Sequence, residues 1–487
     1  MRLRASEIAA AAGGTVICGD PDTFIGSIAT DSRSIGEDCL FIPIRGARTD
    51  GHKYISQAVG SGAVASLTAC GMEELKEMTG DSAFSAVLIR VEDTLRALQA
   101  IGRYYREKYV GIRYIGITGS VGKTTVREMT ACALSPAYNV YSTKGNANSQ
   151  TGVPITVTET GKDAQIGVIE MGISEFGEMS RLSDIVRCDM AVFSVIGVSH
   201  IGNLGTRENI LREKLCICES MKPGGYLILN GDDDMLSRPD IDAFLPENAR
   251  NGGINIVYYG TGDNALYRAV NISENEGCCE YDLEIGGKKT AHVSLSVPGM
   301  HMLGNSLAAL TAAVLSGADP QAAADALHCF RSLDGRGQMF DCRGIKVIND
   351  AYNAAPQSVK AGLRVLDSIE VQGRRIAVLA DMLELGSDEE EYHRDIGRFI
   401  NAETKVDIVM LFGRLSAFTA EGIKLGFCET GNGHMPWIYC FDSLEDLKER
   451  LASELYEGDA VLFKGSNSMK LGSVVSELFS DENTSCR

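Results

Sequence analysis

The feature that most constrains this chain is a lysine-containing glycine turn, Gly116-Ile-Thr-Gly-Ser-Val-Gly-Lys-Thr-Thr125, which follows the largely apolar run Ile112–Ile115. A strand, a glycine turn and a helix that begins at Gly-Lys-Thr together form a cradle for phosphate groups. Backbone N–H groups and the positive end of the helix dipole attract the phosphates, Lys123 adds a mobile charge, and the Thr124 hydroxyl can hold Mg²⁺. The segment therefore predicts that the chain binds ATP or GTP.

The turn departs from the usual spacing at one position. The standard pattern has a glycine five residues before the glycine of Gly-Lys-Thr, and this chain has Ile117 there. Its glycines are Gly116, Gly119 and Gly122. On this motif alone, a glycine-rich turn that only connects a strand to a helix is the alternative.

The length and charge of the chain limit the classes of protein to which it can belong. A chain of 487 residues is too long for one hydrophobic core and predicts about three domains. Its net charge of −19, without a sustained block of Lys and Arg, argues against nucleic acid or an anionic membrane surface as a partner. Anionic ligands are then expected to bind at local clusters of residues.

Cysteine usage and apolar content predict a cytoplasmic protein. The 14 cysteines include no Cys-x-x-Cys pair, so we expect reduced thiols rather than disulfides or structural zinc. The N-terminal segment MRLRASEIAAAAGG contains Glu7 and lacks a long apolar core, which favours a short helix over a signal peptide. No stretch of the sequence approaches the ~20 apolar residues of a membrane-spanning helix.

The first two of three expected domains differ in their patterns of strands and helices. Residues 1–108 are expected to form a small α/β domain, with apolar runs at Cys39–Ile44 and Ala86–Ile89 and a helix at Thr94–Lys108. Residues 109–332 alternate apolar strands with helical patterns, which predicts a parallel sheet covered by helices. The strands expected there are Ile112–Thr118, Ile166–Met171, Met190–Ile196 and Tyr226–Leu229. An antiparallel excursion at residues 253–298, with strands Val257–Tyr259, Tyr281–Ile285 and His292–Val297, precedes a helix at Met302–Leu315.

The third expected domain, residues 333–487, follows a boundary loop at Ser332–Gln338. Its helices include Ser443–Leu455, and the pattern predicts a Rossmann-like domain without a Gly-x-Gly-x-x-Gly turn of its own. The expected strands are Ile345–Ile348, Arg375–Leu379, Ile408–Phe412, Ile438–Phe441 and Ala460–Phe463.

Polar residues follow several of these strands, at the edge where a parallel sheet binds ligands. Glu170 ends one strand and could hold Mg²⁺, although a glutamate there is more often an ordinary loop contact. His200 could bind metal through a neutral imidazole, yet a lone histidine is more often a packed or surface residue. Lys214 lies on the following helix and would by default be a solvated lysine.

Two later loops carry the same kind of ambiguity. The segment from Val347 to Pro356 contains Asp350 and suits either a nucleotide contact or a simple strand-to-helix turn. Lys464 and Ser466 follow the last strand, where a lysine and a hydroxyl could meet an anionic substrate.

These residues belong to a series of motifs in a specific order. The motifs are TGSVGKTT, EMG with FGEM, SHIGNLGTRENILREK, PGMHMLGNSLAA, GRGQMF, NDAYNAAP, LADMLELG and KGSNSMK, and the N-terminal TDSRSIGEDCLFIPIRGARTDGHKYISQAVGSGA fits with them. From about residue 25 to residue 475, the chain resembles the Mur ligase family. The resemblance implies an N-terminal domain for the UDP substrate, a central P-loop ATPase domain with a mostly parallel sheet, and a C-terminal Rossmann-like domain.

The activity implied by the resemblance is ATP-dependent amide-bond formation in the cytoplasm. The expected reaction joins D-Ala-D-Ala to UDP-MurNAc-tripeptide through an acyl phosphate, during synthesis of a peptidoglycan precursor. The resemblance implies ATP and Mg²⁺ as cofactors, small molecules as partners and a monomeric enzyme.

The resemblance also implies roles for individual residues. Ser32 and Arg33 belong to an Asp-Ser-Arg motif that contacts the uridine end of the substrate. Catalytic positions are matched by Lys123, His200 and Lys214, and Lys214 also matches a lysine that carries a carbamate in relatives. The positions that match magnesium ligands are Thr124, Glu170, His200 and Lys214. The positions that match ATP contacts are Gly119, Ser120, Gly122, Lys123, Thr124, Thr125, Asn305, Arg336 and Asp350.

Some positions depart from the family pattern. The family commonly has other residues at Asn349, Ala355, Ala380, Asn467 and Gly472. These changes leave the expected ATP site intact and concern the contacts to the dipeptide. The chain also lacks the Asp-Asn-Pro-Arg motif of ligases that add the third amino acid, which favours the dipeptide-adding branch.

Three alternatives accompany this interpretation. One is a ligase of another amino acid, or of folate polyglutamate, on the same scaffold; the Asp-Ser-Arg motif argues against folate. Another is an NTPase switch whose nucleotide turnover is independent of any amine. The last is an inactive homologue, against which the presence of Lys123, Glu170, His200 and Lys214 argues.

Overall fold

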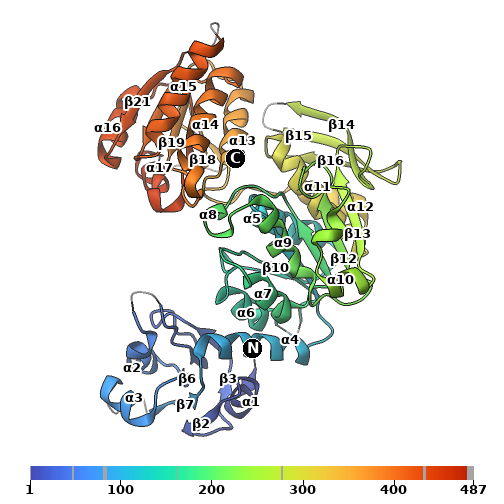
Figure 1. Ribbon diagram of the computed structural model, residues 1–487, viewed down its shortest axis with the longest axis vertical. Helices are drawn as coiled ribbons and strands as arrows, with labels where there is room; N and C mark the ends of the chain where they lie inside the picture. Colours follow the sequence, from blue (N-terminus) through green and yellow to red (C-terminus); the bar gives the residue numbers. More distant parts are fainter. Residues whose placement is uncertain are drawn as a thin grey trace.

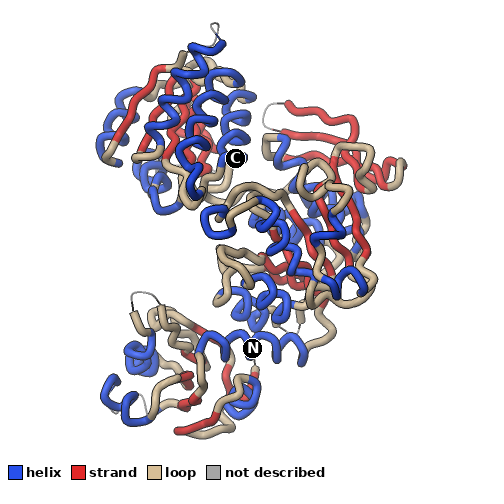
Figure 2. The backbone as a smooth tube through the Cα atoms, viewed as in Figure 1, coloured by secondary structure: helices blue, strands red, loops and turns tan. Residues whose placement is uncertain are grey.

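The computed structural model describes residues 2–46, 49–79, 85–161, 163–275, 278–430 and 435–479. Three α/β units follow one another along the long axis of the molecule (Figure 1), and no sheet is shared between them. Helices lie against the faces of these sheets (Figure 2). The predicted α/β class with mostly parallel sheets is confirmed.

The N-terminal unit contains a five-stranded sheet in the order β2-β7-β6-β5-β4 and a small antiparallel ladder of β1 with β3. Strands β4 to β7 are parallel, whereas β2 runs antiparallel to β7 at the edge. The strands are β1 (Leu3–Arg4), β2 (Thr15–Cys18), β3 (Phe24–Ile25), β4 (Ser27–Ala29), β5 (Cys39–Phe41), β6 (Ala65–Thr68) and β7 (Val87–Arg90). The helices are α1 (Ala5–Ala11), η1 (Gly51–Tyr54), α2 (Ile55–Gly60) and α3 (Met72–Thr79). The expected short N-terminal helix is α1.

Helix α4 (Thr94–Lys108) has the bounds that the sequence predicts, and it packs between the first two units (Figure 1). The side chain of Asp93 caps its first turn by accepting from Arg96 N at 2.9 Å. Further along, the buried Arg106 donates to Val186 O at 2.9 Å. At Gly102 an added Cβ would lie 2.8 Å from Pro154 Cβ. One apolar core therefore continues from the N-terminal unit into the central one.

The central unit is built on a nine-stranded sheet in the order β16-β15-β14-β13-β12-β11-β8-β10-β9. Its strands are β8 (Arg113–Thr118), β9 (Val140–Ser142), β10 (Ile166–Glu170), β11 (Met190–Phe193), β12 (Tyr226–Asn230), β13 (Asn255–Gly260), β14 (Tyr267–Asn275), β15 (Cys278–Ile285) and β16 (Lys288–Leu295). Its helices are α5 (Lys123–Leu134), α6 (Gly152–Glu159), α7 (Glu178–Val186), α8 (Ile201–Leu204), α9 (Arg207–Leu215), η3 (Cys216–Cys218), η4 (Ile241–Phe244), α10 (Glu247–Asn251), α11 (Met300–Leu315) and α12 (Pro320–His328). One face of the sheet packs against α5, α11 and α12, and the other against α6, α7 and α9.

The prediction for residues 253–298 is partly wrong. Strand β13, expected in the antiparallel excursion, pairs in parallel with β12 and extends the central sheet. Only β14, β15 and β16 form an antiparallel meander, which continues the same sheet. Alternation of apolar and polar residues predicts a strand but does not report the direction of its neighbour, so the sequence pattern could not separate the two cases.

The C-terminal unit has a six-stranded sheet in the order β17-β18-β22-β19-β20-β21, parallel except for β17. Its strands are β17 (Gln338–Cys342), β18 (Ile345–Asp350), β19 (Arg375–Ala380), β20 (Ile408–Phe412), β21 (Trp437–Phe441) and β22 (Ala460–Lys464). Its helices are α13 (Pro356–Ser368), η5 (Gly386–Asp388), α14 (Glu389–Glu403), α15 (Ser416–Thr430), α16 (Leu444–Glu454), η6 (Asn467–Met469) and α17 (Leu471–Phe479). Helices α13, α14 and α15 cover one face, and α16 and α17 the other.

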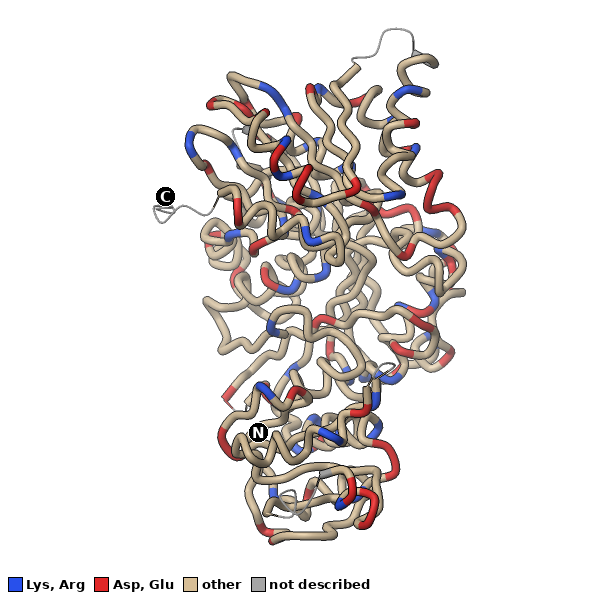
Figure 3. The backbone as a smooth tube through the Cα atoms, turned by 90° about the vertical axis from the view of Figure 1, so that its left-hand side faces the viewer, with Lys and Arg blue, Asp and Glu red and all other residues tan. Residues whose placement is uncertain are grey.

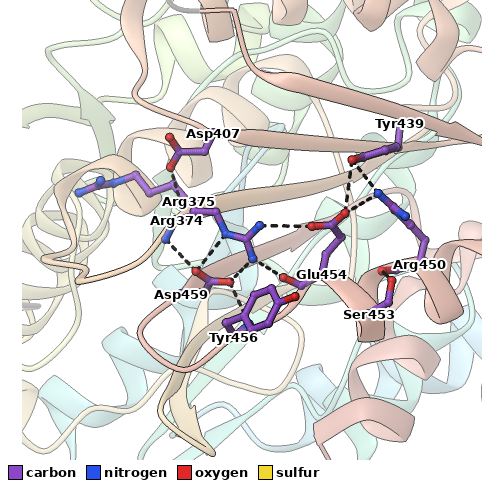
Figure 4. Close-up of polar contacts among 9 residues, drawn as sticks. All are labelled: Arg374, Arg375, Asp407, Tyr439, Arg450, Ser453, Glu454, Tyr456 and Asp459. Carbon is purple, nitrogen blue, oxygen red and sulfur yellow. Dashed lines mark hydrogen bonds and ion pairs between the residues drawn. The ribbon is translucent and has the colours of Figure 1, made fainter.

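An ion-pair network joins the start of β19 to the end of α16 and to the turn before β22 (Figure 4). The buried carboxylate of Asp459 accepts from the backbone N of Arg374 and from its Nη2, both at 2.8 Å. The same guanidinium reaches Glu454 at 3.2 Å, and Arg450 contacts Glu454 from an exposed position. The network fixes the edge of the sheet at which the parallel strands β19 and β22 begin, opposite the edge formed by their carboxyl ends.

Replacement of Arg374 by alanine is expected to lower the free energy of unfolding of the C-terminal unit by about 2 kcal/mol, because it leaves Asp459 buried without its cation. This value is reduced from that of a fully buried pair, since the Arg374 side chain is 33% exposed. Arg450→Ala is the matched control, with an expected loss below about 1 kcal/mol. Urea unfolding followed by fluorescence of Trp437, the single tryptophan and a neighbour of Arg374, measures this unit directly. Equal losses in both variants would contradict the expectation.

Two features of the structure concern the partners against which the sequence argues, which are nucleic acid and membranes. Figure 3 shows Lys and Arg interspersed with Asp and Glu along the molecule. None of the helices in the described ranges combines the length and apolar character that crossing a membrane requires. Within the same ranges, no disulfide joins any of the cysteines.

Candidate active site

The glycine turn lies between β8 and α5, as the sequence predicts, and its backbone requires glycine at two positions. Gly119 has φ +143° and Gly122 has φ +87°, conformations that residues with a Cβ rarely adopt. A Cβ on Gly119 would lie 1.9 Å from Ser194 Oγ, and one on Gly122 would lie 2.9 Å from Asn305 Oδ1. The turn is therefore a tight backbone cradle at the N-terminus of a helix, the geometry that binds phosphate.

Lys123 and its neighbours supply polar groups inside this cradle. Lys123 Nζ donates to the carbonyl oxygens of Gly119 at 2.9 Å and Ser120 at 3.2 Å. Burial lowers the pKa of Lys123, Glu170 opposes this shift and Arg336 adds to it. The hydroxyl of Ser120 is buried without a hydrogen-bond partner among the described residues, and Thr124, four residues further along the chain, is also buried. An unpaired buried hydroxyl in a phosphate cradle fits a ligand that brings acceptor oxygens.

Glu170 ends β10 beside the glycine turn, and its carboxylate is held by two residues that the sequence interpretation missed. Oε2 accepts from Arg127 Nη1 at 3.1 Å, and Oε1 accepts from Asn148 Nδ2 at 2.7 Å. Both Arg127 and Glu170 are almost fully buried. Each carboxylate oxygen has two lone pairs, so these bonds leave acceptor capacity for a metal ion. A polar side chain four residues into an expected helix resembles a solvated one, which is why Arg127 was not singled out.

His200 lies in the loop between β11 and α8, with a left-handed backbone at φ +62°. Its Nδ1 is 2.6 Å from Oε2 of Glu384, a residue of the C-terminal unit that the sequence interpretation missed. Burial lowers the pKa of His200; Glu384 raises it, and Lys123 and Lys214 lower it. The imidazole is therefore favoured in its neutral form, the form that can ligate a metal.

Lys214 is on α9 and only 2% exposed, contrary to the default of a solvated lysine. Burial shifts its pKa well below the usual range, and Lys123 lowers it further, while Glu213 acts in the opposite direction. The carboxylate of Glu213 is itself engaged by the backbone N atoms of Gly177 and Met179, each at 3.0 Å. The side chain of Lys214 is thus a buried amine whose neutral, nucleophilic form is favoured by burial.

Residues of the C-terminal unit face the same site. The Arg336 guanidinium stacks on the ring of Tyr352, 3.9 Å from its centre, and it acts electrostatically on Lys123. Asp350 Oδ2 accepts from the buried Lys464 at 2.5 Å, and Lys464 also donates to Asn353 O at 3.1 Å. The two polar loops that the sequence singled out as separate segments are therefore one ion-paired cluster.

Ser32 and Arg33 lie in the N-terminal unit, in the turn that follows β4, and not in the unit that carries the glycine turn. Ser32 Oγ donates to Gln57 Oε1 at 3.1 Å, and the exposed Arg33 pairs with Asp31 at 2.6 Å. Hydrogen bonds from Arg33 lower the pKa of Asp31 to about 2. The structure thus brings together the residues expected around ATP and keeps those expected at the uridine apart from them.

The residues predicted to hold Mg²⁺ fit the ion in chemical type. Across the described ranges, no three His, Cys, Asp or Glu side chains group closely enough to hold a metal by themselves. The predicted set instead combines Glu170 and His200 with the hydroxyl of Thr124 and with Lys214. An oxygen-rich ligand such as a nucleotide phosphate would complete the oxygen ligands that Mg²⁺ prefers.

The loop after β19, which carries Glu384, is held by His393 from α14. The imidazole Nε2 accepts from Met382 N at 3.0 Å, and Nδ1 lies 2.6 Å from the carbonyl oxygen of Glu389. This pattern requires a neutral ring with its proton on Nδ1. Burial lowers the pKa of His393; Glu389 and Asp381 oppose the shift and Arg414 adds to it.

His393 is consequently expected to make the protein less stable as the pH falls below about 6.5. The unfolded histidine has a pKa of about 6.5, so below that pH the unfolded chain binds more protons than the folded one. The contribution is complete above about pH 6.5 and is lost as the pH falls toward the lowered value, at up to about 1.4 kcal/mol per pH unit. Thermal unfolding between pH 7.5 and 5.5 should show a steeper decline for the wild type than for His393→Gln. Parallel curves for the two proteins would rule this coupling out.

A glycine phosphate cradle, a buried carboxylate and a buried lysine at one sheet edge, faced by residues of a further α/β unit, define a nucleotide-dependent ligase. Three family models match successive parts of the chain: the Mur ligase family catalytic domain at residues 24–106, the Mur ligase middle domain at 117–313, and the Mur ligase glutamate ligase domain at 335–467. The chain belongs to the Mur ligase family.

Individual relatives match over nearly the whole chain. The UDP-N-acetylmuramoyl-tripeptide–D-alanyl-D-alanine ligase of Bacillus subtilis is 35% identical, covering 94% of this chain and 93% of the relative. The enzyme of the same name from Synechocystis is 32% identical, with 95% and 94% covered. The crystal structure of MurF from Acinetobacter baumannii is 26% identical, with a TM-score of 0.86 over 99% of both chains. The MurF ligase of Thermotoga maritima in complex with ADP shares the fold, with 24% identity, a TM-score of 0.76, and 93% and 96% covered.

Proposed function

We propose that the protein is an ATP-dependent ligase that joins D-Ala-D-Ala to UDP-MurNAc-tripeptide through an acyl phosphate, in the synthesis of a peptidoglycan precursor. The observation that carries the proposal is the match over 94% of the chain to an enzyme with this name, at 35% identity. The site supports it, since a phosphate cradle, a buried carboxylate and a buried lysine lie together in the central unit.

The reaction proceeds in two steps, and the chain's own residues contribute to each. The substrate carboxylate attacks the γ-phosphate of ATP in line, and the new acyl phosphate leaves ADP bound at the cradle. Lys123 and the turn's N–H groups offset the charge that builds on the transferring oxygens. The amine of the dipeptide then attacks the activated carbonyl, and phosphate leaves. Arg336 and Asp350 approach from the C-terminal unit and would help to exclude water from the acyl phosphate.

The metal site is proposed at Thr124, Glu170, His200 and Lys214. When bound there, Mg²⁺ would neutralise phosphate charge during transfer. An unmodified lysine is no ligand for this ion, whereas a carbamate on Lys214 would add carboxylate-like oxygens. The buried amine of Lys214, whose pKa is lowered by desolvation, suits the addition of CO₂ that forms such a carbamate.

The remaining roles follow the three units. We assign residues 1–108 to the UDP end of the substrate with contacts from Ser32 and Arg33, residues 109–332 to ATP, and residues 333–487 to the dipeptide and domain closure. The ATP contacts proposed are Gly119, Ser120, Gly122, Lys123, Thr124, Thr125, Asn305, Arg336 and Asp350. The cytoplasm, where ATP and UDP-linked precursors are made, is the proposed location, and a monomer is the proposed form.

Phosphate release with ATP, Mg²⁺ and UDP-MurNAc-tripeptide, measured with and without D-Ala-D-Ala, tests the proposal. Release that needs both substrates, with a product heavier by the dipeptide, is the expected result. Release that ignores the amine would instead identify an NTPase switch. Activity only with other amines would identify a ligase of different specificity. Parallel assays with meso-diaminopimelate and L-lysine tripeptides determine the third residue of the acceptor.

A further inference from the structure

A carboxylate of the C-terminal unit contacts the histidine proposed to ligate metal in the central unit. Glu384 Oε2 lies 2.6 Å from His200 Nδ1 as an ion-pair contact, and this buried ring nitrogen makes no hydrogen bond of regular geometry within the described ranges. The two residues lie in loops that follow strands of different sheets, β11 and β19, so their contact depends on how the units dock. In many metal sites a carboxylate engages the ring nitrogen that does not bind the metal, and thereby fixes the tautomer and orientation of the ring.

Both partners of this contact have unusual backbone conformations. Among the described residues, His200 and Glu384 are two of the seven non-glycine residues with positive φ, at +62° and +65°. Such conformations are uncommon for residues with a Cβ and persist where the surroundings enforce them, often at functional sites. An exposed ion pair contributes little to stability, and the Glu384 side chain is 63% exposed. Stability therefore does not account for two strained residues meeting at one contact.

The loop that carries Glu384 is held rigidly within the C-terminal unit. Ser466 Oγ accepts from Leu383 N at 3.0 Å, and His393 holds Met382 as described above. Asp381 accepts from the backbone N and the hydroxyl of Ser416 at 2.7 and 2.8 Å. A loop with these anchors presents Glu384 in one position rather than several.

The same loop docks closely on the segment that follows His200. Gly202 N donates to the carbonyl oxygen of Glu384 at 3.4 Å, and a Cβ on Gly202 would lie 3.2 Å from Gly386 N. Val198, from the His200 segment, is buried in the same apolar cluster as Leu385. Backbone, glycine contact and apolar packing thus bring the two segments together independently of the His200–Glu384 pair.

We propose that Glu384 is a positioning residue for His200: it keeps the proton on Nδ1 and leaves Nε2 as the metal-binding nitrogen. The central metal site is then complete only when the C-terminal unit is docked, which couples domain position to metal affinity. This inference rests on the proposed function for the assignment of His200 as a metal ligand. It adds a residue of the C-terminal unit to the chemistry of the central one.

The test compares Glu384→Ala with Glu390→Ala, which removes the same charge from nearby α14 without touching His200. Binding of Mn²⁺ in the presence of a non-hydrolysable ATP analogue, followed by electron paramagnetic resonance, should weaken about tenfold in Glu384→Ala and stay unchanged in Glu390→Ala. Glu384→Gln keeps an acceptor oxygen without the charge, and it should retain an intermediate affinity. If Glu384→Ala does not fold, the Mn²⁺ affinity of Glu384→Gln is compared with that of Glu390→Ala instead. Unchanged Mn²⁺ affinity in a folded Glu384 variant would overturn the proposal.

Two further readouts separate positioning from general damage. In ¹⁵N-histidine-labelled protein, the His200 resonance, assigned from its loss in His200→Gln, should report the Nδ1–H tautomer in the wild type and lose it in Glu384→Ala. In steady-state assays, the KM for Mg²⁺ should rise about tenfold while kcat at saturating Mg²⁺ changes little. A fall in kcat alone, with the tautomer unchanged, would refute the role. The tautomer and Mn²⁺ measurements need no ligation, so they decide on Glu384 even if the acceptor or the dipeptide is assigned wrongly.

Discussion

Replacement of Lys123 by alanine is expected to reduce phosphate release in the complete reaction by at least about 10³-fold, or about 4 kcal/mol of transition-state stabilisation. Lys123 sits within the phosphate cradle, where its charge acts in a site shielded from water. Its removal leaves the charge on the transferring phosphoryl group without its nearest mobile cation. Steady-state phosphate release with both substrates present measures the effect.

The control for this variant is binding of the UDP substrate. Ser32 and Arg33 lie in a different α/β unit from Lys123, so the affinity for UDP-MurNAc-tripeptide should stay within about twofold in Lys123→Ala. Arg33→Ala should have the reverse effect: it should lower the affinity for the UDP substrate and leave the affinity for ATP unchanged. Lys144→Ala, which removes an exposed lysine of the central unit, should affect neither. Loss of both affinities in a folded Lys123→Ala protein would contradict the division of the two sites between units.

Lys214→Ala is expected to lower the rate of ligation by about 10² to 10³-fold, because it removes the group proposed to carry a carbamate beside the transferring phosphate. In protein equilibrated with ¹³C-bicarbonate, a carbamate resonance should appear in the wild type and vanish in the variant. A buried lysine with a lowered pKa provides the neutral amine that CO₂ requires.

Two comparisons make the Lys214 experiment specific. Lys222→Ala removes a half-exposed lysine of the same unit and should leave both the resonance and the rate unchanged. Short carboxylic acids such as acetate should partly restore activity to Lys214→Ala, because they can place a carboxylate in the space left by the side chain. A carbamate resonance that persists in Lys214→Ala would reassign the modification to another lysine.

Much of the fold was predictable from the chain, because strand and helix patterns are local. Helix α4 and strand β20 have the bounds expected from the sequence. Strands β9, β14 and β17 were not anticipated, and the direction of β13 was wrong, because strand pairing depends on segments far apart in the chain. The predicted domain boundaries at 108 and 332 remain predictions, and the apolar core that runs through α4 joins the first two units.

The site shows the same division between local and long-range information. Lys123, Glu170 and His200 were found because each follows a strand or opens a helix within a motif, and Lys214 because its place in a motif matches the family resemblance. Arg127, Asn148 and Glu384 were missed, since each contacts a functional residue only through the tertiary fold. No local pattern distinguishes a helical arginine that pairs with a buried carboxylate from one that lies in water.

By itself the sequence determined the phosphate cradle, because a tight turn with left-handed glycines at 119 and 122 and a lysine at a helix start is specified by neighbouring residues. Only the tertiary structure decided the chemical state of the groups around it. The pKa of Lys214 is lowered because several elements together remove water from it, and His200 meets Glu384 because two units dock. Burial and contacts between domains arise from the packing of the whole chain, so local sequence does not encode them.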